Sequence, residues 1–146
     1  MIDMSTIKPL ALLLSRVLLG VILIAHGWDK FQITGLEGVS GFFASLGIPA
    51  AGVVAPLVGA IELIGGIMIL LGVFTRYVSA VVAVVMLGAA LSAHVSAGIY
   101  VTNGGWELVG AIGAGMLALI AAGAGAWSID AVLEQKRTTE RELVNA

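Results

Sequence analysis

The chain has 146 residues, of which 60% are hydrophobic and 11% are charged, and its mean hydropathy is +1.10. Soluble domains usually carry about a quarter charged residues, so this composition excludes an ordinary water-soluble protein. A net charge of −2 gives no basic surface for nucleic acid, and the lack of cysteine excludes thiolate catalysis, disulfide exchange and thiolate metal sites. We therefore expect a membrane protein whose partner is the lipid bilayer, with no nucleic-acid partner and no metal site.

Four apolar stretches are long enough to cross a bilayer as helices, which takes about 20 residues each. They cover residues 9–28, 52–74, 77–97 and 104–127. Backbone groups in lipid must pair within their own segment, so these lengths predict helices and not strands. The predicted fold is all-α: a four-transmembrane-helix bundle that forms one integral membrane domain over residues 1–146. A charged cytoplasmic tail, 128–146, follows the bundle, and Ser128 is placed to cap a short helix that runs through Leu133.

The connection between the first two spans contains a shorter amphipathic helix. Its apolar residues follow the i, i+3, i+4, i+7 spacing of one helical face, namely Val39, Phe42, Phe43 and Leu46. A helix of this kind lies in the interface of a membrane. It serves either as a connector on the membrane surface or as a lid over a site beneath it.

Basic residues near the span ends predict the orientation in the membrane. With four crossings, one side of the membrane receives Lys8, Arg76, Lys136, Arg137 and Arg141. The other side receives Lys30 alone, beside Asp29 and Glu37. We therefore expect a multi-pass protein of the cell membrane with both termini in the cytoplasm.

Two segments of the chain resemble each other. Residues 17–26 (VLLGVILIAH) align without gaps on residues 85–94 (VMLGAALSAH), and each segment ends in a histidine. The two spans would run in the same direction, as in a parallel repeat, although apolar sequence of low complexity also matches itself by chance. At about 1.5 Å of rise per residue, His26 and His94 are expected at the same depth near the outer leaflet.

Ionisable side chains inside the spans are the candidate site residues, because each costs about 2.5–3.5 kcal/mol at the centre of a bilayer. These residues are Arg16, His26, Glu62, His94 and Glu107. We expect Glu62, His26 and His94 to be catalytic and Arg16, Lys30 and Glu107 to bind a ligand. Imidazole beside carboxylate suits a quinone or a phenol, since histidine donates to a carbonyl oxygen or exchanges a proton that the acid relays.

Structural roles remain open for several of these residues. The histidines can sit in the interface with their ring nitrogens in water, and Glu107 can act as a cap at the start of a helix. Arg16 can reach the headgroups or pair with Glu62.

Taken together, the motifs resemble the DoxX family of small bacterial and archaeal membrane proteins over about residues 10–132. They are, in chain order, Arg16…Gly20…His26-Gly27…Lys30, Gly59-x-x-Glu62-Leu63-x-Gly65-Gly66, Leu70-Leu71-Gly72…Thr75-Arg76, His94 and Ser128-Ile129-Asp130. The resemblance implies a four-helix membrane bundle that acts as an oxidoreductase subunit. One branch of the family supplies the small subunit of an archaeal thiosulfate:quinone oxidoreductase, and another is linked to detoxification of oxidants with partner proteins. The polar positions of the family correspond here to Arg16, His26, Lys30, Glu62 and His94.

The leading hypothesis is a membrane subunit of a quinone-linked oxidoreductase that binds a quinone or small ligand in a polar pocket of the outer leaflet. Electrons would come from a redox partner protein or a soluble substrate. A less favoured variant holds haem between His26 and His94 as axial ligands. The alternative is a non-enzymatic scaffold or ligand-binding subunit that stabilises partner envelope proteins. A transporter is a weaker option, since one four-helix bundle offers little room for alternating access unless it forms a homo-oligomer.

Overall fold

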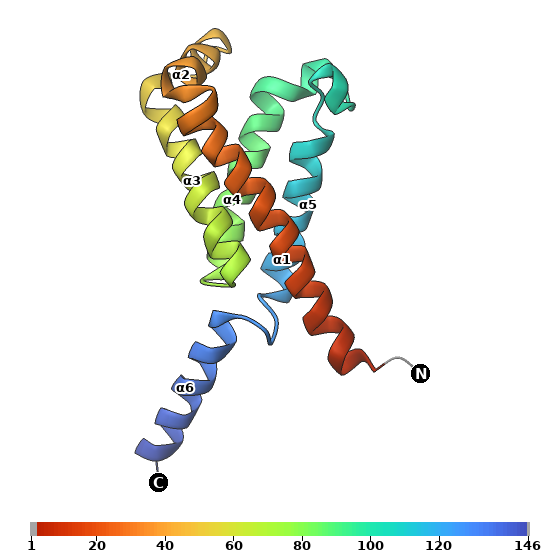
Figure 1. The fold of residues 1–146 in the computed structure, drawn as a ribbon, viewed down its shortest axis with the longest axis vertical. Coiled ribbons are helices and arrows are strands. Elements are labelled where there is room, and N and C mark those ends of the chain that lie inside the picture. Colours follow the sequence, from red (N-terminus) through yellow and green to blue (C-terminus); the bar gives the residue numbers. More distant parts are fainter. Residues whose placement is uncertain (1–2, 146) are drawn as a thin grey trace.

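The computed structural model describes residues 3–145, and every regular element in that part of the chain is helical (Figure 1). The α-helices are α1 (Met4–Trp28), α2 (Gly35–Ser45), α3 (Ala51–Leu71), α4 (Thr75–Ala89), α5 (Glu107–Ala122) and α6 (Ile129–Val144). Short π-helical turns extend α1 over Asp29–Ile33 and α4 over Ala90–His94, and 3₁₀ turns follow at Val95–Ala97 and Val101–Asn103. The all-α prediction is confirmed.

Three helical segments have the length and hydropathy of a membrane span within residues 3–145: Met4–Ile33, Ala51–Leu71 and Thr75–Ala97. The fourth predicted span, 104–127, contains a shorter apolar helix of 16 residues, α5. It ends at Ala122 because Gly123 and Gly125 adopt φ angles of 76° and 83°, which belong to the left-handed side of backbone space and stop a helix.

The first span starts earlier than predicted. Its expected start near Pro9 assumed that proline occupies the first turn, whereas α1 begins at Met4. Asp3 caps the helix by accepting a hydrogen bond from the Ser5 backbone N–H at 3.0 Å, and a capping carboxylate is among the strongest local signals for a helix start. Pro9 therefore lies inside the helix.

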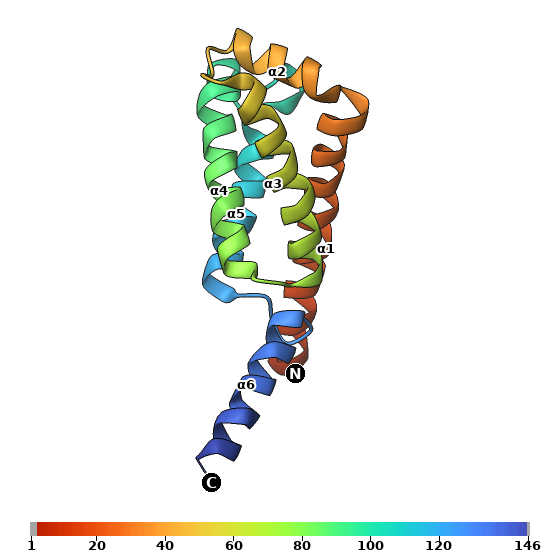
Figure 2. The ribbon, with the colours of Figure 1, turned by 90° about the vertical axis from the view of Figure 1, so that its left-hand side faces the viewer.

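Helices α1 and α3 form one closely packed pair (Figures 1 and 2). Glycine makes this approach feasible at Gly20, Gly27 and Gly66. A Cβ atom added to Gly20 would lie 2.8 Å from the carbonyl oxygen of Gly66, and one added to Gly27 would collide with the backbone of Leu63. Stripes of small residues of this kind let helix backbones approach each other in membranes, where lipid gives no hydrophobic drive for association.

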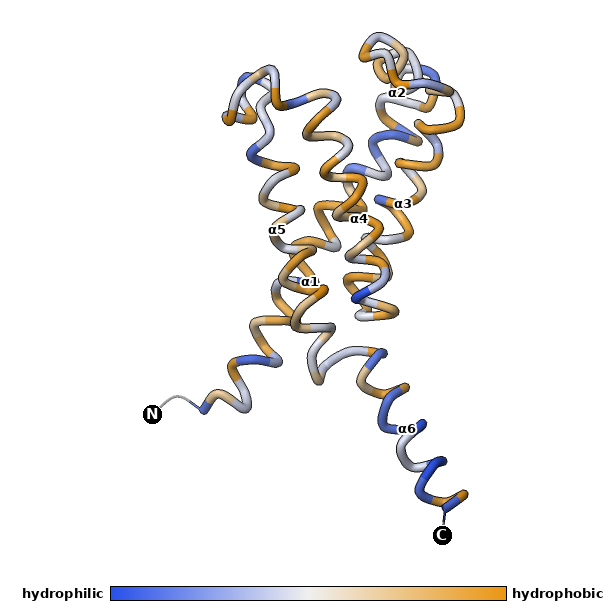
Figure 3. Tube along the Cα trace, turned by 180° about the vertical axis from the view of Figure 1, so that it is seen from behind, coloured by the Kyte–Doolittle hydropathy of each residue, from blue (hydrophilic) through white to orange (hydrophobic). Residues whose placement is uncertain are grey.

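Helices α4 and α5 form the second pair, and a shared apolar core joins the two pairs. The buried core residues come from all four helices, one each from α1 and α3, two from α4 and three from α5: Leu23, Ile69, Val82, Met86, Ile112, Met116 and Leu119. Figure 3 shows that hydrophobic residues dominate these four helices, whereas α6 is largely hydrophilic. In Figure 1 the two pairs meet near the end where α3 turns into α4 and separate toward α2. We call the first the closed end and the second the open end.

Arg16 fastens the closed end. Its side chain is 1% exposed, and its guanidinium donates to the carbonyl oxygen of Leu70 at 3.0 Å and to that of Trp127 at 2.5 Å. These carbonyls lie at the end of α3 and in the segment that leads to α6, so one side chain joins three parts of the chain. The last carbonyl groups of a helix have no partner within the helix, and an arginine satisfies them at low cost.

Asp130 and Arg76 add two further contacts at the closed end. The Asp130 carboxylate accepts from the backbone N–H groups of Phe74 at 2.7 Å and Thr75 at 2.9 Å, which caps the start of α4 from a distant part of the sequence. The Arg76 guanidinium donates to the carbonyl oxygen of Ile120 at 2.6 Å, near the end of α5. Both contacts satisfy helix-terminal backbone groups.

The charged tail is more ordered than predicted. Ser128 caps α6 as expected, because its hydroxyl oxygen accepts from the backbone N–H of Ala131 at 3.2 Å. The helix then continues to Val144 and does not end near Leu133. It projects away from the bundle at the closed end (Figures 1 and 2).

Candidate functional site

A cavity of about 690 Å³ opens between the two helix pairs at the open end. Drug-sized ligands usually occupy pockets of about 300–1,000 Å³ that are mostly apolar with a few polar groups. The wall contributed by the first pair carries His26, Asp29, Lys30, Thr34 and Glu62, and the opposite wall carries Ser92 and His94. The remaining lining is mainly aliphatic and aromatic.

Lys30 and Glu62 form a partly buried ion pair on the first wall. The Lys30 Nζ atom lies 2.5 Å from Glu62 Oε2, and the two side chains are 16% and 7% exposed. Gly59 makes this contact feasible, because its lack of a side chain leaves room for the stem of Lys30 and the ring of Phe31 against α3. A Cβ atom at Gly59 would lie 3.4 Å from Lys30 Cβ and 3.0 Å from the Phe31 ring. The pair thus keeps both charges compensated inside an apolar wall.

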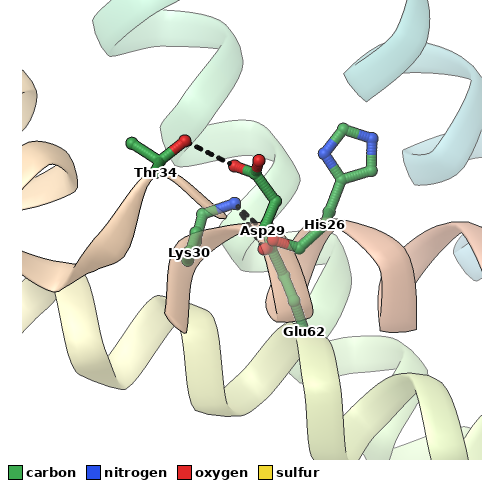
Figure 4. A network of polar contacts seen from close by, with 5 residues as sticks. All are labelled: His26, Asp29, Lys30, Thr34 and Glu62. Carbon is green, nitrogen blue, oxygen red and sulfur yellow. Dashed lines mark hydrogen bonds and ion pairs between the residues drawn. The ribbon is translucent and has the colours of Figure 1, made fainter. Parts of the chain in front are cut away.

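A π-helical turn positions the neighbouring polar groups. The backbone N–H of Thr34 donates to the carbonyl oxygen of Asp29 at 2.9 Å, and the Thr34 hydroxyl donates to the Asp29 carboxylate at the same distance. Such turns insert one extra residue, which rotates the following side chains around the helix axis, and they are frequent at functional sites. Figure 4 shows His26 and Asp29 extending to the same side of α1, with the imidazole turned away from the Lys30–Glu62 pair.

His94 stands on the opposite wall, at the end of the second π-helical turn. Its Nδ1 atom lies 2.7 Å from the carbonyl oxygen of Gly104. A carbonyl oxygen can only accept, so Nδ1 carries the hydrogen. When the ring is neutral, Nε2 therefore holds a lone pair and acts as an acceptor. The two walls thus differ in chemistry: one offers a compensated ion pair, a carboxylate and a free imidazole, and the other offers a fixed hydrogen-bond acceptor.

Helix α2 covers the cavity. Val39, Phe42, Phe43 and Leu46, the predicted apolar face of this helix, all line the cavity. The helix lies between Gly35 and Gly47, both with φ of 76°. Among residues 35–48, no side chain forms a hydrogen bond or an ion pair with another helix, so apolar packing holds the cover in place.

Comparison with known proteins identifies the family of this chain. The sequence model of the DoxX family matches residues 11–95. The chain belongs to the DoxX family. It is 41% identical over 85 residues to the "Putative oxidoreductase CatD" of Bacillus subtilis, a match that spans 58% of this chain and 60% of the relative.

Two further relatives match along most of the chain. The uncharacterized membrane protein Rv3486 of Mycobacterium tuberculosis is 30% identical over 89% of this chain and 85% of its own length. The inner membrane protein YqjF of Escherichia coli is 32% identical over 91% of this chain and 99% of its own length. No solved structure matches. The resemblance to DoxX proteins inferred from the sequence is therefore confirmed.

Four of the six predicted site residues line the same cavity: His26, Lys30, Glu62 and His94. All four lie in the segment that the DoxX model matches. Their catalytic and ligand-binding roles remain predictions. The sequence predicted that the two histidines lie near the same end of their helices but not that Glu62 pairs with Lys30.

Arg16 and Glu107 lie elsewhere, and this corrects their placement in the pocket. Arg16 is at the closed end, where its guanidinium is used on backbone carbonyls and forms no pair with Glu62. Glu107 is in the first turn of α5 and accepts from the Val101 backbone N–H at 2.8 Å, so it holds the 3₁₀ turn before α5 and does not cap α5 itself. Neither residue lines the cavity.

Sequence reasoning left three polar lining groups off the list of site residues: Asp29, Thr34 and Ser92. Asp29 could have been found, since it lies three residues after His26 and directly before Lys30. Thr34 and Ser92 carry no such signal. For a metal, the described residues 3–145 contain no cluster of three or more His, Cys, Asp or Glu side chains.

Proposed function

We propose that this DoxX protein is the membrane subunit of a quinone-linked oxidoreductase and that its cavity binds a quinone or a similar lipophilic ligand. The observation that carries the proposal is a largely apolar cavity of about 690 Å³ with proton-exchanging groups on opposite walls. The name of the relative CatD supports the oxidoreductase class. A quinone supplies reversible two-electron chemistry coupled to proton transfer, and the protein supplies the groups that bind the quinone and exchange protons with it.

The proposed topology has α1, α3, α4 and α5 crossing the membrane and α2 lying in the outer interface. At about 1.5 Å per residue, the 16 residues of α5 span roughly 24 Å, and apolar residues after Ala122 extend it toward the inner surface. The excess of Lys and Arg near the closed end supports a cytoplasmic position for both termini. The cavity then opens in the outer leaflet.

Each wall has a distinct proposed role. Nε2 of neutral His94 accepts a hydrogen bond from a ligand hydroxyl and takes up its proton. The His26 imidazole has no hydrogen-bond partner among residues 3–145 and can donate to a ligand oxygen, whereas the His26 backbone carbonyl accepts from Lys30 Nζ at 3.5 Å. Lys30 donates a hydrogen bond to a ligand oxygen, and Glu62 holds Lys30 at the wall and exchanges a proton. Helix α2 excludes water from the ligand.

The test is binding of decylubiquinone to the purified protein in detergent, measured by the quenching of tryptophan fluorescence. We expect saturable binding in the wild type and roughly tenfold weaker binding in His26→Ala, because this change removes the imidazole that donates a hydrogen bond to a quinone carbonyl oxygen, and such a bond is worth about 1 kcal/mol or more. Glu62→Gln and the double variant Lys30→Met/Glu62→Gln should also bind more weakly. Glu142→Gln in α6, outside the cavity, is the matched control.

Equal affinity of wild type and all cavity variants would contradict the proposal. The non-enzymatic scaffold remains the second candidate, supported by the charged helix α6 that projects from the bundle. Thermal unfolding of His26→Ala and His94→Ala separates the two, since structural residues lose stability when removed and ligand-binding residues often do not. An absorbance spectrum with no Soret band would reject haem between His26 and His94.

A further inference from the structure

The charges that line the cavity do not cancel. Lys30 Nζ is paired with Glu62 Oε2 at 2.5 Å, and this is the only ion pair among residues 3–145. The other ionisable lining groups are Asp29 and the two histidines. With the histidines counted as neutral, the cavity therefore carries one uncompensated negative charge, on Asp29.

The Asp29 carboxylate is held in place but not neutralised. Its Oδ2 atom accepts from the Thr34 hydroxyl at 2.9 Å, and no basic side chain lies within 4.0 Å of it. The Asp29 side chain is half-buried at the cavity wall. Partial removal from water strengthens its interaction with a charged ligand, because the local dielectric is lower than in bulk solvent.

The cover of the cavity adds aromatic surface. Phe42 and Phe43 both line the cavity from α2, and their ring centroids lie 6.2 Å apart with the planes tilted by 49°. The face of an aromatic ring attracts cations, and this attraction increases when the cation is desolvated. An anion meets the opposite situation here, since the one available cationic side chain is already paired.

We infer that the cavity also binds lipophilic aromatic cations, with Asp29 as the counter-ion and Phe42 and Phe43 as the aromatic surface. This inference shares the cavity with the proposed function but does not require redox chemistry. The charge selects cations over anions of the same shape, and the apolar walls select delocalised, weakly hydrated cations over small hydrated ones.

The test compares tetraphenylphosphonium with tetraphenylborate, which share their shape and differ in the sign of the charge. Binding to the purified full-length protein is measured by equilibrium dialysis at pH 8, above the usual titration range of histidine, with empty detergent micelles as the partition blank. We expect saturable binding of tetraphenylphosphonium and no saturable binding of tetraphenylborate. In Asp29→Asn the affinity for the cation should fall roughly tenfold, as for loss of one charge partner in a partly desolvated site.

Two further variants sharpen the result. Phe42→Leu and Phe43→Leu should each weaken cation binding by about two- to fivefold, the size of a cation–π contribution. Glu37→Gln is the matched control, because it removes a carboxylate from the exposed first turn of α2, outside the cavity lining, and it should bind as the wild type does.

Unchanged affinity in Asp29→Asn, or an equal loss in Glu37→Gln, would overturn the inference. So would saturable binding of tetraphenylborate at equal strength. These outcomes are separate from the quinone measurement: a protein that binds decylubiquinone but not tetraphenylphosphonium refutes only the cation site, and the reverse result refutes only the quinone proposal.

Discussion

The two ends of this helix bundle use charged side chains in opposite ways. At the closed end, the side chains of Arg16, Arg76 and Asp130 form hydrogen bonds with backbone groups of helix termini, and the segments they join are packed together. At the open end, Asp29 and the histidines line a cavity between separated helices. Polar groups that satisfy backbone in an apolar surrounding stabilise a fold, whereas polar groups held at a cavity are available to a ligand.

The closed end should therefore be where a single substitution costs the most stability. We expect Arg16→Met to lower the free energy of unfolding by about 3 kcal/mol, because it leaves buried carbonyl groups of α3 and of the segment before α6 without a donor. Thermal and denaturant unfolding in detergent measure this. A loss below that of the cavity variants would break the comparison between the two ends.

The glycine contacts that join α1 and α3 give the next largest effect. Gly27→Ala places a methyl group against the backbone of Leu63 and should cost about 2 kcal/mol, typical of overpacking. Gly88→Ala is the control, since a Cβ atom there has nothing within 4 Å, and it should be neutral or slightly stabilising. The same unfolding measurement applies to both, and equal losses would contradict the close approach.

At the open end, the ion pair can be removed in two steps. Glu62→Gln should destabilise the protein by about 1–2 kcal/mol because it leaves the Lys30 charge without a partner in a half-buried position. The double variant Lys30→Met/Glu62→Gln should regain most of that loss, since neither charge then remains. Unfolding of both variants is the measurement. A double variant less stable than Glu62→Gln would mean that the pair serves the fold and not the cavity.

The smallest effect is expected at Asp3, beyond the closed end. Hydrogen bonds from the Ser5 hydroxyl and the Ser5 backbone N–H lower the pKa of Asp3 from its ordinary value of 3.8. Because the pKa is depressed in the folded state, the cap stabilises the start of α1 above the unfolded pKa and is lost as the pH falls through the folded one. An NMR titration should show the pKa of Asp3 rising in Ser5→Ala, and no change would exclude the hydroxyl as the main cause.

Much of the architecture follows from local rules that act on single residues. The cap at Ser128 and the apolar face of α2 could be predicted because each depends on residues within about one helical turn. The predicted end of the first span at Trp28 was too early, because the π-helical turn Asp29–Ile33 continues the helical segment. The errors came from competing local signals. Helix α1 starts at the cap that Asp3 provides and not at Pro9, and the positive φ angles of Gly123 and Gly125 end α5 earlier than predicted.

The site was harder to predict, because it depends on which helices are neighbours. Helix rise alone gave the matching depths of His26 and His94. The pairing of Lys30 with Glu62 needs the α1–α3 contact, the room left by Gly59 and the rotation that a π-helical turn gives to Lys30. None of these features has a recognisable signal in one sequence, and Arg16 was the only partner that sequence reasoning considered for Glu62.

The apolar packing between the cavity and the closed end also affects how protons can move through the protein. Between the cavity and that end lie Leu23, Ile69, Val82 and Met116, each fully buried, and aliphatic side chains in contact leave no chain of hydrogen bonds along which a proton could hop. With the proposed orientation, protons taken up or released at the cavity are exchanged with the outer compartment alone. With that orientation, we expect this subunit to move no protons across the membrane by itself.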